Sequence, residues 1–257
     1  MLNLLSELSG KRKTMLRELG RKVGLEVRLN ALNARNDLRL AYFLKVFNID
    51  LVLDIGANRG QFAQELFNTG YSGRVVSFEA LPDAHKRLKE AAERQKYSWI
   101  VAPRVALSDQ PGTAQFHVTE ADTSSSLFAP KESFVASTPQ ARPVEVIEVP
   151  TARLDDIVGE IGLSVENCFL KMDVQGGESL VLAGAPNVLG TAKGLMTELS
   201  LRPLYDGQPS AQRLLEAIYE AGFEIWDVWQ GYRDPRSHRL NQIDIVCFKP
   251  NKTSSLA

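Results

Sequence analysis

The sequence predicts an α/β protein built on a doubly wound, mostly parallel sheet. Short apolar segments alternate with helical patterns along most of the chain after residue 48. Two of these segments end in an acid, Asp54 and Asp173, and run through a glycine turn into a helix. The last two apolar segments, residues 223–228 and 243–248, can close the sheet as an antiparallel pair. We therefore expect seven strands with an antiparallel last strand, and additional helices at the N-terminus.

The composition excludes several classes of protein. The 257 residues suffice for one large domain with a substantial core, and a net charge of -1 gives no general attraction for nucleic acid. No apolar run is long enough to span a bilayer, and the N-terminus lacks the leading basic region of a signal peptide. Cys168 and Cys247 lie in apolar runs and are expected to be buried thiols. We expect a cytoplasmic protein without a nucleic-acid partner or a transmembrane segment.

The chain is predicted to have three parts. A helical extension, residues 1–48, precedes the main domain, residues 49–250, and a frayed tail, residues 251–257, follows it. The first half of the extension is basic, with leucines at helical spacing, and residues 37–44 form a second, apolar helix. We interpret the extension as a cap over the cofactor site or a sheet face. The alternatives are a homodimer contact or a membrane-surface segment, but Glu7, Glu18 and Glu26 interrupt the basic face.

The first predicted strand, residues 51–55, leads into a glycine turn and a helix over residues 59–67. A dinucleotide fingerprint would need glycine at positions 58 and 61, and a P-loop would need Gly-Lys at positions 61 and 62. These positions hold Asn58, Gln61 and Phe62, so both cofactor types are disfavoured. The pattern Asp54-x-Gly56-x-x-x-Gly60 instead resembles motif I of class I S-adenosylmethionine-dependent methyltransferases. The alternative is an ordinary strand–turn–helix junction.

That resemblance implies a set of cofactor-binding residues at and after the turn. A strand-end carboxylate suits a cationic sulfonium better than a pyrophosphate, which it would repel. The expected contacts are Asp54, Gly56, Ala57, Asn58, Gly60 and Phe62.

The second predicted strand, residues 74–79, ends in Glu79, about 20 residues past the turn, where an acid contacts the ribose hydroxyls in such folds. Ala80 follows it, and Pro82 opens a helix over residues 83–95. The third strand is expected over residues 97–105. Ser108 and Asp109 then fall at the same sheet edge and could hydrogen-bond an adenine ring, although both residue types are also common in turns.

Residues 121–142 contain a serine cluster and several prolines and show no helical period. A long loop in a compact domain is either functional or disordered. We interpret it as a mobile lid over the acceptor pocket, with plain disorder as the alternative. A strand over residues 144–149 and a short helix follow.

A second strand–glycine–helix junction runs from residue 167 to residue 185, and its strand ends at Asp173. The next strand, residues 194–198, ends in Glu198, and an amphipathic helix covers residues 211–221. Because strand ends of a parallel sheet share one edge, we expect Asp173 to face the same crevice as Asp54.

With this junction, the sequence resembles the FkbM-type methyltransferase family over about residues 50–249. The pieces that carry the resemblance are residues 54–60, 78–79, 106–109, the serines before Leu127, residues 154–156, 171–178, Glu198, and residues 203–205, 222–223 and 242–244. The resemblance implies a class I methyltransferase (Rossmann-like) fold, S-adenosyl-L-methionine as cofactor, and O-methylation of a small-molecule, glycan or glycolipid acceptor. Two positions depart from the family's commonest form, which has Glu at Gln175 and a small or aromatic residue at Gly177.

Methyl transfer to a hydroxyl benefits from positioning and from a nearby base. Our candidate base is Asp173, with Glu198 and His238 as weaker candidates, and Asp173 could instead bind the cofactor. Gln175, which cannot act as a base, is expected at the substrate with Ser125, Ser126 and Tyr205. His85 and His117 are expected to be structural.

The strand-associated acids Asp173, Glu198 and Asp244 could also converge on Mg²⁺. Two other functions remain open from the sequence. One is a non-catalytic module that keeps the fold to bind a partner or a glycolipid. The other, an NAD-dependent sugar dehydrogenase, is disfavoured by the glycine spacing.

Overall fold

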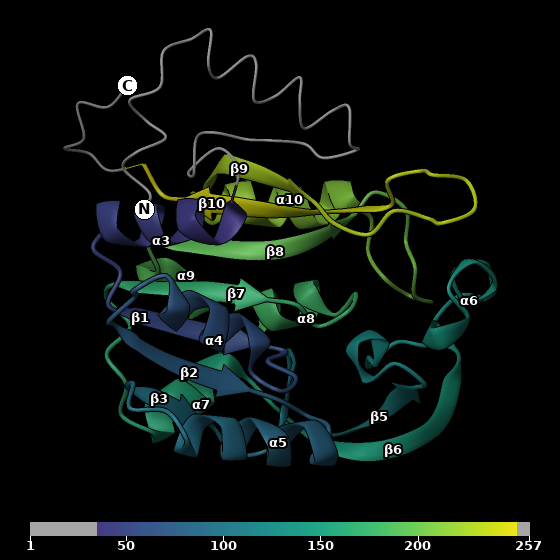
Figure 1. Ribbon diagram of the computed structural model, residues 1–257, viewed down its shortest axis with the longest axis horizontal. Coiled ribbons are helices and arrows are strands. Elements are labelled where there is room, and N and C mark those ends of the chain that lie inside the picture. Colours follow the sequence, from purple (N-terminus) through teal and green to yellow (C-terminus); the bar gives the residue numbers. More distant parts are fainter. Residues whose placement is uncertain (1–34, 251–257) are drawn as a thin grey trace, which may run out of the picture.

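The computed structural model describes residues 35–250 and contains a central seven-stranded sheet (Figure 1). The strand order is β3-β2-β1-β7-β8-β10-β9, and β10 pairs antiparallel with both β8 and β9. The bounds are β1 (Leu51–Ile55), β2 (Arg74–Phe78), β3 (Trp99–Val101), β7 (Cys168–Met172), β8 (Gly194–Ser200), β9 (Glu224–Gln230) and β10 (Gln242–Phe248). The predicted doubly wound sheet with an antiparallel last strand is confirmed.

Helices cover both faces of this sheet, because alternate residues of each buried strand face opposite sides. On one face Leu51, Leu53 and Ile55 of β1 join a core with the helices α7 (Leu154–Glu160), α8 (Glu178–Ala183), α9 (Pro186–Thr191) and α10 (Ala211–Glu220). On the other face Val52 packs with α3 (Asn36–Val46), α4 (Gln61–Asn68) and α5 (Pro82–Glu93). Both cysteines are buried free thiols, as expected.

The helix predicted over residues 37–44 is α3, which packs on the sheet near β9 and β10. Its Leu40 and Leu44 are buried, Phe47 stacks on Phe248 with ring centroids 4.0 Å apart, and Arg39 pairs with Asp227 at 2.6 Å. This helix therefore covers a sheet face and does not line the crevice at the carboxyl ends of the strands. The rest of the predicted extension, its suggested dimer contact and the tail lie outside the described residues.

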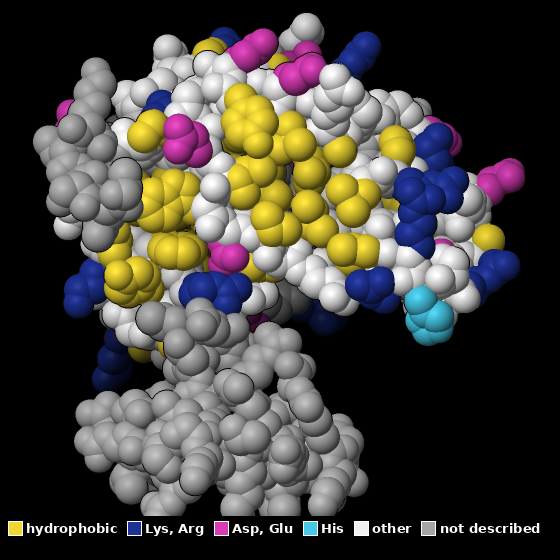
Figure 2. All heavy atoms as spheres, turned by 90° about the horizontal axis from the view of Figure 1, so that it is seen from above, with side chains coloured by type: hydrophobic (Ala, Val, Ile, Leu, Met, Phe, Trp, Pro, Cys, Tyr) yellow, Lys and Arg dark blue, Asp and Glu magenta, His cyan; other side chains and the backbone are white. Residues whose placement is uncertain are grey.

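Hydrophobic side chains also gather on the face of the molecule seen in Figure 2, which is the upper, β9 side of Figure 1. The exposed hydrophobic residues of α3 and β9 are Tyr42, Ile225, Trp226 and Val228. Within residues 35–250, none of the helices has the length and apolar character needed to cross a membrane.

A second, three-stranded sheet with the order β4-β6-β5 was not predicted. It consists of β4 (Ala106–Leu107), β5 (Gly112–Thr119) and β6 (Pro143–Ala152), and it lies at the end of the main sheet toward which β1 and β2 point (Figure 1). The third strand predicted over residues 97–105 is present as β3 beside β2, but its predicted extent is wrong, because β3 ends at Val101. Pro103, which has no N–H to donate, separates β3 in the main sheet from β4 in the second sheet.

The expectation of a segment without helices over residues 121–142 is also wrong. The segment contains the 3₁₀ helix η1 (Asp122–Ser124), the helix α6 (Glu132–Ser137) and the 3₁₀ helix η2 (Pro139–Ala141). Arg59, at the start of the α4 region, pairs with Asp122 at 2.6 Å. The segment is thus tied to the glycine turn, and its motion as a lid stays a prediction.

Candidate active site

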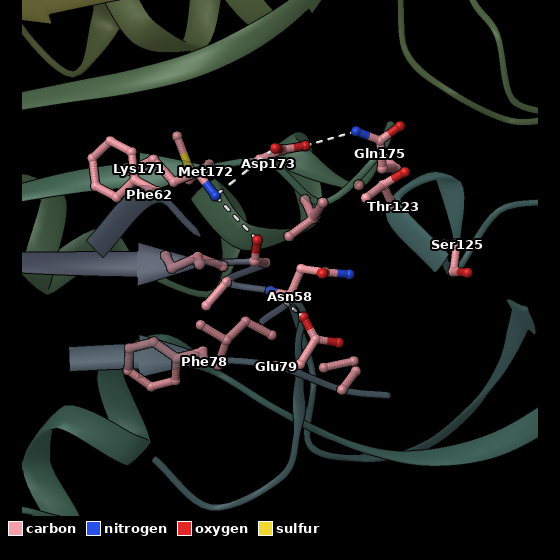
Figure 3. Close-up of a pocket in the computed structure, with 18 of the residues that line it drawn as sticks. Asn58, Phe62, Phe78, Glu79, Thr123, Ser125, Lys171, Met172, Asp173 and Gln175 are labelled. Carbon is pink, nitrogen blue, oxygen red and sulfur yellow. Dashed lines mark hydrogen bonds and ion pairs between the residues drawn. The ribbon is translucent and has the colours of Figure 1, made fainter. Parts of the chain in front are cut away.

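A cavity of about 340 Å³ lies at the carboxyl ends of β1, β2, β7 and β8. One wall is the glycine turn after β1, and the opposite wall is the segment after β5, which contributes Asp122, Thr123, Ser125 and Leu127. Figure 3 shows Asn58, Glu79, Asp173 and Gln175 around this space. Its size and its mixed apolar and polar lining are those of a site for a cofactor-sized ligand.

The glycine turn brings the ends of β1 and β7 into contact. Gly56 has φ +72°, and a Cβ there would overlap the main-chain carbonyl oxygen of Asp173. Gly60 has φ +86°, and a Cβ there would collide with Trp99 and Leu88. Gly56 therefore lines the cavity, whereas Gly60 lies behind it and permits the packing of α4.

Glu79 lies at the end of β2 and joins the turn to the cavity. Its Oε2 accepts the Asn58 N–H at 2.7 Å, and its Oε1 accepts the Leu81 N–H at 2.8 Å. Burial raises the pKa of this carboxyl, and the N–H donors oppose the shift. Each oxygen keeps a further lone pair, so a hydroxyl-bearing ligand in the cavity can still donate to it.

Asp54 does not face the cavity, contrary to the expectation that it contacts the cofactor directly. It is fully buried, accepts the Ser77 hydroxyl at 3.0 Å, and lies 3.2 Å from Lys171 Nζ. Lys171 is its register partner on β7, so both side chains project from the same face of the sheet. The Lys171 ammonium also donates to the Gly56 carbonyl at 3.0 Å, so the ion pair is hydrogen-bonded to the glycine turn and stabilises it.

Lys171 also lines the cavity, and the sequence patterns above did not identify it as a site residue. Burial opposes its charge, but Asp54 and Asp173 outweigh burial and raise its pKa. A lysine inside an otherwise apolar strand is the signal that could have identified it, because such a charge needs a buried partner.

The apolar part of the cavity lies beyond Glu79 and is formed by Phe78, Leu81, Leu107, Phe116 and Leu127. Ala57, Phe62 and Ala80 also line the cavity, and their contact with the cofactor stays a prediction. Ser108 and Asp109 do not. The Ser108 hydroxyl donates to Asp109 at 3.0 Å, and the residues before this pair, Ala106 and Leu107, take its place.

The opposite, acidic part contains Asp173, Glu198 and Asp244. Asp244 lies directly across from Glu198 on the neighbouring strand, and burial raises its pKa to about 6. Burial, reinforced by Asp173, raises the pKa of Glu198 well above its usual range. Glu178 lies behind them, accepts the Val174 and Gly176 N–H groups, and has its pKa raised to about 7 by burial.

The Mg²⁺ hypothesis gains no support from this cluster. Among residues 35–250 there is no group of three or more His, Cys, Asp or Glu residues that could hold a metal ion. Gln175 Nε2 instead lies between two of the acids and donates to Asp173 Oδ1 at 2.6 Å and to Glu198 Oε2 at 3.1 Å. A cation bound here would need the carboxylate oxygens to face it directly, and the amide protons of Gln175 already occupy oxygens of both acids.

The expected substrate and catalytic residues divide into those at the cavity and those behind it. Gln175 and Ser125 line it, but the buried Ser126 and Tyr205 contact Gln175 from behind. His238 is exposed in the loop between β9 and β10, and the structure does not bring it to the crevice. His85 is structural, as expected, because its buried Nε2 is 2.9 Å from the Ala102 carbonyl oxygen.

The strand order, the antiparallel β10 and the crevice at the glycine turn define a class I methyltransferase fold. The FkbM methyltransferase domain model matches residues 54–225. The chain therefore belongs to the FkbM methyltransferase family, and the predictions of that family and of an S-adenosylmethionine-dependent methyltransferase are confirmed.

A curated relative and two solved structures show the extent of the similarity. The 2-O-methyltransferase NoeI of Sinorhizobium fredii is 32% identical over 178 residues, which are 65% of this chain and 70% of that protein. Fibrillarin of Aeropyrum pernix with S-adenosyl-L-methionine has a TM-score of 0.44 at 15% identity, covering 82% of this chain and 76% of its own. Magnesium protoporphyrin IX methyltransferase of Synechocystis has a TM-score of 0.45 at 10% identity, covering 93% and 97%.

Proposed function

We propose that this protein is an O-methyltransferase that transfers a methyl group from S-adenosylmethionine to a hydroxyl of a sugar or a glycosylated natural product. The similarity to a 2-O-methyltransferase supports the choice of oxygen. The bound cofactor would supply the electrophilic methyl group. The chain's own residues bind the two reactants, align them and accept the hydroxyl proton.

The cavity fits the cofactor in its shape and its chemistry. Gly56 lets the turn lie against the end of β7 and lines the cavity, and Glu79 offers carboxylate oxygens that suit ribose hydroxyls. The apolar residues beyond Glu79 suit an adenine ring. Asp173, near Lys171 and the turn, suits the amino-acid end or the acceptor.

The position of Asp173 carries the proposal. Its side chain is 41% exposed, lines the same cavity as Glu79 and the turn, and receives a hydrogen bond from Gln175. A carboxylate that is accessible and held in place can take a proton from a hydroxyl in the cavity. We assign the role of general base to Asp173 for this reason. Glu198, which is more deeply buried, is suited to hydrogen-bonding the acceptor.

The acceptor end is also chemically suited to neutral hydroxyl groups. Its side chains are the carboxylates Asp173, Glu198 and Asp244 and the amide of Gln175. Lys171, the cation nearest to them, is already paired with Asp54. An acceptor with a phosphate or a carboxylate beside the reacting hydroxyl would be repelled here.

The test has two arms. Calorimetric titration with S-adenosylhomocysteine measures cofactor binding, and mass spectrometry detects the gain of one methyl group on a panel of methyl glycosides of neutral hexoses, deoxyhexoses and N-acetylhexosamines. We expect cofactor binding and methylation of at least one glycoside. Binding without methylation of any glycoside would contradict the acceptor class. Absence of cofactor binding at high concentration would favour a non-catalytic module.

A further inference from the structure

The side-chain amide of Gln175 makes all of its hydrogen bonds within the protein, which was not expected of a substrate-binding residue. Besides the bonds from Nε2 to Asp173 and Glu198, its Oε1 lies 2.8 Å from the Tyr205 hydroxyl. Its main-chain oxygen accepts the Ser126 hydroxyl at 2.7 Å. Both amide protons are therefore used, and substrate binding through the amide N–H groups would require breaking one of these bonds.

The orientation of the amide follows from the charges around it. Exchanging the amide oxygen and nitrogen would place a carbonyl oxygen 2.6 Å from Asp173 Oδ1, and two acceptors at that distance repel each other unless the acid is protonated. The Tyr205 hydroxyl has one proton and two neighbouring acceptors, Gln175 Oε1 and the Ser124 carbonyl at 3.0 Å. The two acids therefore fix the orientation with Nε2 toward them, and the single Tyr205 proton is shared between Gln175 Oε1 and the Ser124 carbonyl.

The groups behind Gln175 are rigid. Ser126 and Tyr205 are fully buried, and the Tyr205 ring packs edge-to-face against Phe134 with centroids 5.7 Å apart. Gln175 itself has φ +55°, a left-handed conformation that non-glycine residues adopt only when their surroundings fix it. The amide is thus fixed to the segment after β5, which forms the opposite wall of the cavity.

We propose that Gln175 is a positioning residue that holds the Asp173 carboxylate in its working orientation and separates it from Glu198. Asp173 is at the end of a strand with no other side-chain donor within hydrogen-bonding distance among the described residues. The ammonium of Lys171 lies 3.8 Å from Asp173 Oδ2, on the other side of the carboxylate from the 2.6 Å contact at Oδ1. The amide therefore fixes the rotation of the carboxylate, and the inference rests on the proposed function only in calling Asp173 the base.

Removing the amide should misplace Asp173 without removing any group that contacts the cofactor. In Gln175→Leu we expect turnover to fall about a hundredfold, the effect of misplacing a reacting group, with cofactor affinity within about threefold of wild type. Tyr205→Phe, a milder variant that keeps the packing, removes one hydrogen bond and should reduce turnover about fivefold. Gln115→Leu, an exposed glutamine on β5, is the matched control and should leave turnover unchanged.

A pH profile separates positioning from a general structural role. The charged or titratable groups around the amide are Asp173 and Lys171 of the β7 region, Glu198 of β8, Asp244 of β10, Glu178 of α8 and Tyr205. Gln175→Glu adds one more carboxylate to this cluster, and the acids must then share a proton up to a higher pH. The acidic limb of the pH–rate profile should move to higher pH, whereas Gln175→Leu and Gln115→Leu serve as comparisons without the added charge.

Crystal structures of wild type and Gln175→Leu with S-adenosylhomocysteine decide the inference even if the acceptor class is wrong. We expect the Asp173 carboxylate to rotate or to occupy two orientations in the variant. An unmoved Asp173 in Gln175→Leu would overturn the positioning role, as would a glycoside turnover within twofold of wild type. Failure of wild type to methylate any glycoside, with Asp173 displaced in the variant, would instead refute the acceptor class alone.

Discussion

Replacing Lys171 with methionine should destabilise the protein more than any surface substitution. The variant keeps the aliphatic part of the side chain but leaves Asp54, which is fully buried, without its countercharge. The bond to the Gly56 carbonyl is lost as well. The damage is thus centred on the junction of β1, β7 and the glycine turn.

The magnitude follows from the geometry. For charges 3.2 Å apart, an effective dielectric constant of about 20 gives an interaction of about 5 kcal/mol. Removal of one partner of a buried ion pair costs about 3–5 kcal/mol in measured cases. We expect Lys171→Met to lower the free energy of unfolding by that amount. The double variant Asp54→Asn/Lys171→Met should regain most of the loss, because it buries no unpaired charge.

Urea unfolding followed by tryptophan fluorescence measures the effect. Trp99 is a local reporter, since its indole N–H donates to Ser77, whose hydroxyl donates to Asp54. The pKa of Lys171 is raised above its usual 10.5, so its contribution is complete below pH 10.5 and is lost as the pH rises through the folded-state pKa. The difference between wild type and variant should therefore stay constant from neutral pH up to about pH 10.5. A loss below about 1 kcal/mol at neutral pH would refute the reasoning.

Three further substitutions test other parts of the site. Asp173→Asn should reduce turnover about a hundredfold or more while cofactor affinity is retained, and a collapse of affinity with normal turnover would show that Asp173 is not the base. Glu79→Gln replaces one oxygen that accepts a main-chain N–H, so calorimetry should show S-adenosylhomocysteine affinity falling about tenfold or more, with unchanged affinity as the contrary result. Glu178→Gln should raise the free energy of unfolding at pH 8 by up to about 3 kcal/mol, because burial raises the pKa of Glu178 from 4.5 to about 7 and its ionised form is disfavoured in the folded state. That gain should vanish below pH 4.5, and a less stable variant at pH 8 in urea unfolding would contradict it.

The parts of the fold that local patterns specify were predictable from the sequence. The strands of the main sheet carry apolar runs bounded by glycines and acids, and Asp54, Glu79 and Asp173 mark their carboxyl ends. The second sheet was not predictable in this way. Its long pair, β5 with β6, joins residues such as Phe116 and Ile147 that are distant in sequence, and β4 is only two residues long.

For the site, residue types were predictable but their partners were not. The sequence indicates an acid at Asp54, but only the strand register shows that Lys171 neutralises it. Tyr205 was expected at the substrate, and its burial behind Gln175 depends on how residues 201–210 pack against α6. His238 was a candidate by residue type alone, and nothing in the sequence places its loop relative to the crevice.

The second sheet has a consequence for how the lining of the cavity can be varied. It lies between β3 and β7 in the chain, and its Phe116 and Val149 pack in a small cluster with Leu81 and Ala84. Thr123, Ser125 and Leu127, which it carries to the cavity, come from neither β1 nor β7. Substitutions or length changes there can reshape this wall of the cavity without altering the glycine turn or the Lys171–Asp54 ion pair.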